Sequence, residues 1–162
     1  MDMGEEGARS ILDRTLISIV DDDELFRESM RKLVMLLGYT VESFPSAADF
    51  LASRLLPETG CLVADVHMPG MTGVEFHARL IKLGHAIPTI LVTAYPDDVV
   101  RDPALKDGVV CYLSKPVDDD HLERCLRSAL KRRPPVLDPL ARWSGCHGWE
   151  RLVCAPSARA HR

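Results

Sequence analysis

Short apolar runs alternate with helical patterns along the chain between residues 16 and 130. The runs are rich in β-branched residues and predict the buried strands of a parallel sheet. They lie at residues 16–20, 41–44, 61–64, 88–92 and 109–113. After each run, apolar side chains recur every three or four positions, as in amphipathic helices. Strand–helix pairs in succession predict an α/β fold in which helices cover both faces of the sheet.

Glycine, serine and proline place the ends of the predicted helices. Ser46 is a candidate N-cap, with Asp49 as a weak capping-box partner, and Pro57 is expected to end that helix. A weaker helix is predicted over residues 97–106, where Pro103 implies a late start, a kink or a loop.

The chain of 162 residues is 46% hydrophobic and 27% charged, which suits one domain with a normal core. We expect a flexible N-terminus at 1–14, the domain at 15–132, and a disordered or loosely attached tail at 133–162. No apolar run is long enough to cross a membrane, and the N-terminus lacks the pattern of a signal peptide. A cytoplasmic protein without membrane attachment is therefore expected.

The net charge of −4 hides an acidic body and a basic tail. An acidic body argues against direct nucleic-acid binding. The tail contains Trp143 and Trp149, which we interpret as patching an apolar surface or mediating association. The five cysteines form no CxxC pair, and Cys61, Cys111 and Cys125 are interpreted as buried small hydrophobic residues.

Polar residues follow four of the predicted strands. Residues 21–24 are Asp-Asp-Asp-Glu, Asp65 and Thr93 end the third and fourth strands, and Lys115 follows the fifth. Because ligands of α/β folds bind at the carboxyl ends of the strands, we expect these groups in one crevice. Hard carboxylate oxygens suit Mg²⁺, and a lysine with a threonine suits a phosphoryl group.

Four stretches carry a family resemblance, and their order at the strand ends makes it specific. They are Ile19-Val20-Asp21-Asp22-Asp23, Val63-Ala64-Asp65-Val66-His67-Met68-Pro69-Gly70-Met71-Thr72-Gly73, Val92-Thr93-Ala94 and Tyr112-Leu113-Ser114-Lys115-Pro116. Over residues 15–130 the chain resembles a response regulator receiver domain of two-component systems, of the FixJ-like branch. The resemblance implies a doubly wound, flavodoxin-like (βα)5 sandwich with a five-stranded parallel sheet in the order 2-1-3-4-5.

The resemblance implies that Asp65 is phosphorylated by a sensor histidine kinase or a phosphotransfer protein. Mg²⁺ would be the cofactor, held by Asp21, Asp22, Asp65 and the backbone carbonyl of His67. The family also implies a cis peptide bond before Pro116.

Further roles follow from the same resemblance. Lys115 would pair with one phosphoryl oxygen and Thr93 would donate its hydroxyl to another, so both join Asp65 in the catalytic set. Thr93 and Tyr112 match the switch positions that respond to phosphorylation. His67 and Tyr95 flank the phosphoryl group and are predicted to tune its lifetime.

Alternative explanations of some of these residues, and alternative functions, were weighed against this interpretation. Asp23 and Glu24 are better explained as acidic residues at a helix N-terminus, and Tyr112 could be a plain core residue. A DNA-binding helix-turn-helix would need more residues than the proline-interrupted tail offers. Phosphatases of the haloacid dehalogenase class have a second Asp where this chain has His67.

We therefore expect a stand-alone, single-domain response regulator, and not a turnover enzyme. A degenerate receiver is disfavoured because the set of acidic, hydroxyl and amine residues is complete. Its output would pass through an unknown partner protein, and a phosphorylation-dependent dimer stays open.

Overall fold

The computed structural model describes residues 15–132. Five strands form one sheet: β1 (Leu16–Val20), β2 (Thr40–Phe44), β3 (Thr59–Asp65), β4 (Thr89–Thr93) and β5 (Cys111–Ser114). The strands are parallel and run in the order β2-β1-β3-β4-β5. The predicted flexible N-terminus and disordered tail lie outside the described residues.

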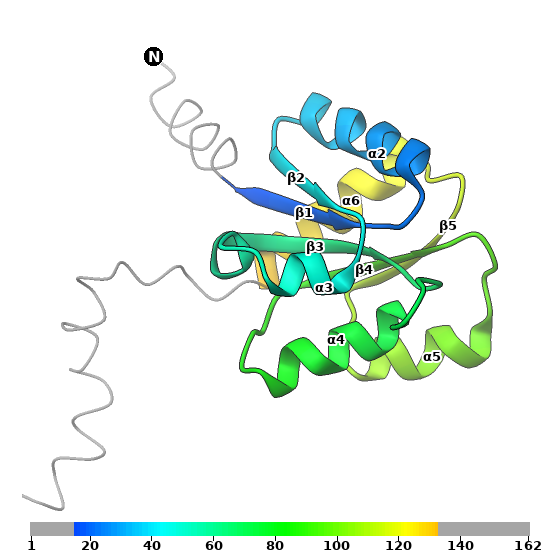
Figure 1. Ribbon diagram of the computed structural model, residues 1–162. Helices are drawn as coiled ribbons and strands as arrows, with labels where there is room; N and C mark the ends of the chain where they lie inside the picture. The colour runs from blue at the N-terminus through cyan, green and yellow to red at the C-terminus, as the bar shows by residue number, and fades with distance from the viewer. Residues whose placement is uncertain (1–14, 133–162) are drawn as a thin grey trace, which may run out of the picture.

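Helices cover both faces of this sheet (Figure 1). They are α2 (Glu24–Leu36), α3 (Ala47–Leu51), α4 (Gly73–Lys82), α5 (Asp98–Lys106) and α6 (Asp119–Arg132), with a short 3-10 helix η1 (Leu56–Glu58) before β3. One apolar core joins the sheet to α2 and α6, and a second joins it to α3, α4 and α5. The predicted α/β class and strand order are confirmed.

The sheet interior explains why the strand sequences are almost continuously apolar. Every residue of β1, β3 and β4 is buried, because helices cover both of their faces. The two polar side chains Ser18 and Thr59 meet in this interior, with their hydroxyl oxygens 2.8 Å apart. Buried polar groups are thus paired where they cannot reach water.

Local caps fix where the helices begin. Asp23 is the N-cap of α2, since its side chain accepts hydrogen bonds from two backbone N–H groups of the first turn. Thr72 and Glu75 form a reciprocal capping box at α4, so that helix begins at Gly73. Ser46 caps α3 as predicted, with its hydroxyl accepting from the Asp49 N–H.

The prediction for Pro57 was wrong, and two of the three effects predicted for Pro103 do not occur. Pro57 does not end α3, which stops at Leu51; it lies in η1, at an early position where its missing N–H is tolerated. Pro103 causes neither a late start nor a loop, since α5 begins at Asp98 and continues through it. One helical hydrogen bond is lost there, and the Asp97 N-cap helps to hold the first turn.

The cysteine prediction holds for two residues of three. Cys61 and Cys125 are buried, whereas Cys111 is only half-buried because it begins the edge strand β5. Among residues 15–132, no helix is long and apolar enough to span a bilayer.

Candidate functional site

Three carboxylates meet at the carboxyl edge of the sheet. Asp21 follows β1 and Asp65 ends β3, and both are buried, with 1% and 7% of their surfaces exposed. Asp22 is open to solvent. One oxygen from each of the three lies within 4.8 Å of the others. Like charges at this spacing repel one another, so the cluster favours a cation with a preference for oxygen ligands.

Lys115 supplies the positive charge that faces this cluster. Its Nζ lies 2.9 Å from Oδ2 of Asp21 and 3.7 Å from Oδ2 of Asp65. The Nζ also lies 3.9 Å from the centre of the Phe26 ring on α2, within cation–π range. A single ammonium group against three carboxylates leaves the site net negative.

The backbone around Lys115 is fixed by the neighbouring strand. The Lys115 N–H donates to the carbonyl of Thr93 at 2.8 Å, and a cis peptide bond joins Lys115 to Pro116, as the resemblance implies. The amine therefore reaches the carboxylates from a turn that is anchored to β4.

Both the side chain and the backbone carbonyl of Asp21 accept hydrogen bonds from residues at the start of α2. Its Oδ1 accepts from the Asp23 N–H at 2.8 Å, and its backbone carbonyl accepts from Nη1 of Arg27 at 2.8 Å. The first turn of α2 therefore orients this carboxylate, and Asp23 is a helix cap, as expected.

Asp65 is the carboxylate with the most unfavourable surroundings. Burial and the neighbouring Asp21 raise the pKa of Asp65, while Lys115 and the backbone N–H of His67 oppose this shift. The His67 N–H lies 3.4 Å from Oδ1 of Asp65, a long hydrogen bond. The Asp65 carboxylate is thus less stabilised by the folded chain than a surface carboxylate is by water.

Gly73 lies so close to the backbone of Asp65 that a residue with a side chain would not fit at this position. A Cβ built on Gly73 would lie 2.4 Å from the Asp65 carbonyl oxygen and 3.0 Å from a methyl carbon of Leu91. The α4 N-terminus can therefore pack under the end of β3 only because residue 73 is glycine.

Thr93 ends β4, beside Asp65 in the adjacent strand, and is fully buried. Its Oγ1 accepts the Tyr95 N–H at 3.0 Å. The rings of Tyr95 and His67 meet edge to face, with centroids 5.9 Å apart. The structure thus brings together the two side chains predicted to tune the phosphoryl lifetime.

Tyr112 sits between the core and the surface. Its ring packs against the core under α5, and its hydroxyl accepts the Asp97 N–H at 3.4 Å. This half-buried position is compatible with both the switch role and the plain core role.

Phe26 and Arg27 belong to the site although no sequence motif marks them. Phe26 matched the apolar periodicity of a helix, and Arg27 fits an exposed helical position. Both reach the site only because α2 packs over the end of β1, which periodicity alone cannot show.

In chemical terms, the carboxylate cluster facing Lys115 could hold a cation next to an anionic group. The family model for the response regulator receiver domain matches residues 17–127. The chain belongs to this family, whose members are receiver domains of two-component response regulators and signalling proteins, not classical enzymes.

Curated relatives agree with this assignment. The chain is 37% identical to the response regulator protein TodT of Pseudomonas putida over 131 residues, which cover 80% of the chain and 58% of TodT. It is 34% identical to the transcriptional regulatory protein FixJ of Bradyrhizobium diazoefficiens over 120 residues, covering 74% of the chain and 58% of FixJ. The chain therefore spans about half the length of these relatives.

Solved structures show the same fold. The crystal structure of FixJ-N has a TM-score of 0.69 and 32% identity, and the match covers 75% of this chain and 98% of that one. The response regulator StyR has a TM-score of 0.70 and 30% identity, with 89% of this chain and 70% of that one covered.

Proposed function

We propose that the chain accepts a phosphoryl group on Asp65 from a sensor histidine kinase or a phosphotransfer protein, and signals through an output protein. The observation that carries this proposal is the placement of Asp65. It is buried, yet it faces the Lys115 ammonium at 3.7 Å and two further carboxylates at metal-binding spacing.

The donor set fits Mg²⁺, the cofactor that the family implies. Asp21, Asp22 and Asp65 offer three hard oxygen ligands, and the exposure of Asp22 leaves room for the waters that Mg²⁺ retains. The backbone carbonyl of His67 is proposed as a further ligand. When bound, the metal neutralises negative charge on the transferring phosphoryl group.

The chain's own residues then account for the transfer. A carboxylate oxygen of Asp65 forms a bond to phosphorus, and the bond from phosphorus to the imidazole nitrogen of the donor breaks. The product is an acyl phosphate on Asp65. Lys115 is within reach to exchange part of its contact with Asp21 for a phosphoryl oxygen.

Thr93 and Tyr112 are proposed to convert the modification into a change of surface. The Thr93 hydroxyl accepts from the Tyr95 N–H, so its own proton can be donated to a phosphoryl oxygen. The Tyr112 ring is only partly buried against the core, and its hydroxyl accepts a long hydrogen bond from the Asp97 N–H, so the hydroxyl is weakly anchored. Phosphorylation would thus bias the position of β5 and α5.

His67 and Tyr95 are proposed to tune how long the acyl phosphate survives. Both are exposed, and their rings meet at the carboxyl edge of the sheet, one from each strand end beside Asp65. Their bulk would control the access of the attacking water.

Intact mass after incubation with acetyl phosphate and Mg²⁺ tests the proposal. The wild type is expected to gain one phosphoryl group, and removal of Mg²⁺ should abolish the gain. Asp65→Asn keeps the shape of the side chain but removes the nucleophile, so it should gain none. An equal adduct on Asp65→Asn, or no adduct on the wild type, would contradict the proposal.

A further inference from the structure

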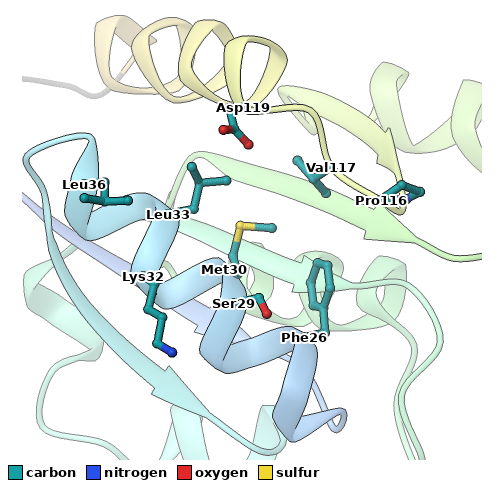
Figure 2. A pocket seen from close by; sticks show the side chains of 9 residues that line it. All are labelled: Phe26, Ser29, Met30, Lys32, Leu33, Leu36, Pro116, Val117 and Asp119. Atoms are coloured by element: carbon teal, nitrogen blue, oxygen red, sulfur yellow. The ribbon is translucent and has the colours of Figure 1, made fainter.

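A groove runs between α2 and the turn that leads from β5 into α6 (Figure 2). Its volume is about 560 Å³. The apolar lining comes from Phe26, Met30, Leu33, Leu36, Pro116 and Val117. Leu36 is 84% exposed, so a large apolar side chain stands almost free at the rim. An apolar hollow of this kind at the protein surface favours an amphipathic partner.

The α6 side of the groove is acidic. Asp119 lines it, and its neighbours Asp118 and Asp120 are also exposed. Within residues 15–132, none of these three carboxylates forms an ion pair. Lys32 lines the groove from α2, on the side away from Asp119 (Figure 2). A ligand that carries aromatic and basic side chains would match both parts of this surface.

The segment 133–162 of this chain has that composition. It carries five arginines against two carboxylates, and it contains both tryptophans of the chain, Trp143 and Trp149. It follows α6, whose 14 residues span about 20 Å from the groove to the helix end. A segment of this length can extend to roughly 100 Å, so the groove is well within its reach.

We propose that residues 133–162 dock into the groove between α2 and α6. The tryptophans occupy the apolar floor, and the arginines lie beside the carboxylates at the start of α6. The net positive charge of the segment is opposite to that of Asp118, Asp119 and Asp120, and its covalent attachment raises its effective concentration at the groove.

Docking would regulate the proposed phosphorylation, and this consequence depends on the proposed function. The groove and the site share a wall, because Phe26 lines the groove and contacts Nζ of Lys115. A filled groove would therefore obstruct a protein donor that approaches Asp65, while a small donor such as acetyl phosphate could still enter.

Tryptophan fluorescence of the full chain tests docking directly, because both tryptophans lie in the segment. The wild type is expected to show blue-shifted emission and protection from acrylamide. Leu36→Glu places a charge at the rim and should weaken docking by about tenfold, which corresponds to about 1.4 kcal/mol. Its emission should shift to the red and its quenching should rise.

Two further variants separate the groove from general effects of charge. Val99→Glu changes a residue of similar exposure, 79%, on α5 at the other face of the sheet, and should leave the fluorescence unchanged. Asp119→Lys should release the tryptophans through charge alone, without touching the apolar floor. Acetyl phosphate should label Leu36→Glu as it labels the wild type, so failure of docking and failure of phosphorylation are read separately.

Three results would overturn the proposal. The first is wild-type quenching equal to that in guanidinium chloride, which would mean an undocked segment. The second is protection that persists in both Leu36→Glu and Asp119→Lys, which would place the tryptophans elsewhere. The third is protection that is lost on dilution, which would assign the contact to a second copy of the chain.

Discussion

His77 and Asp65 are both buried polar side chains beside the parallel sheet, but their surroundings differ. His77 on α4 has its Nδ1 3.2 Å from the Thr89 hydroxyl and its Nε2 3.4 Å from the carbonyl of Asp107. The Thr89 hydroxyl in turn donates to the carbonyl of Ile87 at 3.0 Å. Each polar group around His77 has a neutral partner within the chain.

The surroundings of Asp65 leave charge unpaired. Its nearest cation, Lys115, lies closer to Asp21 than to Asp65, and the remaining neighbour Asp22 is negative. Burial and Asp21 raise the pKa of Asp65. The buried polar groups around His77 are thus hydrogen-bonded to one another, as in a network that serves packing. The groups around Asp65 retain unbalanced negative charge, which a bound ligand can neutralise.

Removal of the Lys115 ammonium, which faces two of the carboxylates, should have the largest effect. Lys115→Ala leaves the carboxylates uncompensated and is expected to lower the free energy of unfolding by about 3 kcal/mol. Mg²⁺ should restore part of this loss, because it supplies the missing positive charge. Urea unfolding with and without Mg²⁺ measures both, with the exposed Lys32→Ala as the control. A Lys115→Ala protein as stable as the wild type without Mg²⁺ would show that the ammonium does not balance the cluster.

Crowding the end of β3 should have the next largest effect. A Cβ at Gly73 would meet the Asp65 carbonyl oxygen at 2.4 Å, so Gly73→Ala is expected to destabilise the fold by about 2 kcal/mol. It should also slow labelling by acetyl phosphate, because Asp65 must shift. Gly84→Ala is a matched control: it has a positive φ of +85° and no atom within 4 Å of the new Cβ, so it should lose stability without slower labelling. Equal labelling rates in the two variants would argue against this contact.

Removal of the His77 hydrogen bonds should reduce stability without changing phosphorylation. His77→Ala leaves the Thr89 hydroxyl with one partner fewer and is expected to lower the free energy of unfolding by about 1.5 kcal/mol. Phosphorylation by acetyl phosphate should continue at the wild-type rate once both proteins are folded. A large fall in that rate would mean that the His77 network and the acidic site are coupled.

The smallest effect expected is a pH-dependent gain in stability. Because the folded state raises the pKa of Asp65 above its ordinary value of 3.8, it binds this proton more tightly than the unfolded chain does. The resulting stabilisation is present at low pH and is lost as the pH rises through the raised pKa. Asp65→Asn should therefore be more stable than the wild type near neutrality, and the difference should shrink on acidification. Thermal unfolding in metal-free buffer across this range measures it, and a difference independent of pH would contradict the cause given.

The sequence predicted most of the fold because its signals are local. Apolar β-branched runs marked the strands, and the side chains directly after them marked the edge where Asp21, Asp65 and Lys115 meet. The prediction that Pro57 ends α3 failed, because Pro57 lies in the separate 3-10 helix η1. Pro103 is accommodated inside α5 without a late start or a loop, although proline has a low helix propensity.

Parts of the site could not be predicted from local signals. The ring of Phe26 below the Lys115 ammonium and the Arg27 contact to the Asp21 carbonyl depend on how α2 crosses the sheet. The roles of His67, Tyr95 and Tyr112 stay predictions, although the rings of the first two do meet beside the site.

Chemical mapping of the phosphorylated residue tests most directly whether Asp65, the carboxylate with unbalanced surroundings, is the acceptor. Reduction of the labelled protein with borohydride converts an aspartyl phosphate into homoserine, and peptide sequencing by mass spectrometry then locates it. We expect homoserine at position 65 alone, in a reaction that requires Mg²⁺. Homoserine at position 21 or 22, or modification of His67 instead, would contradict it.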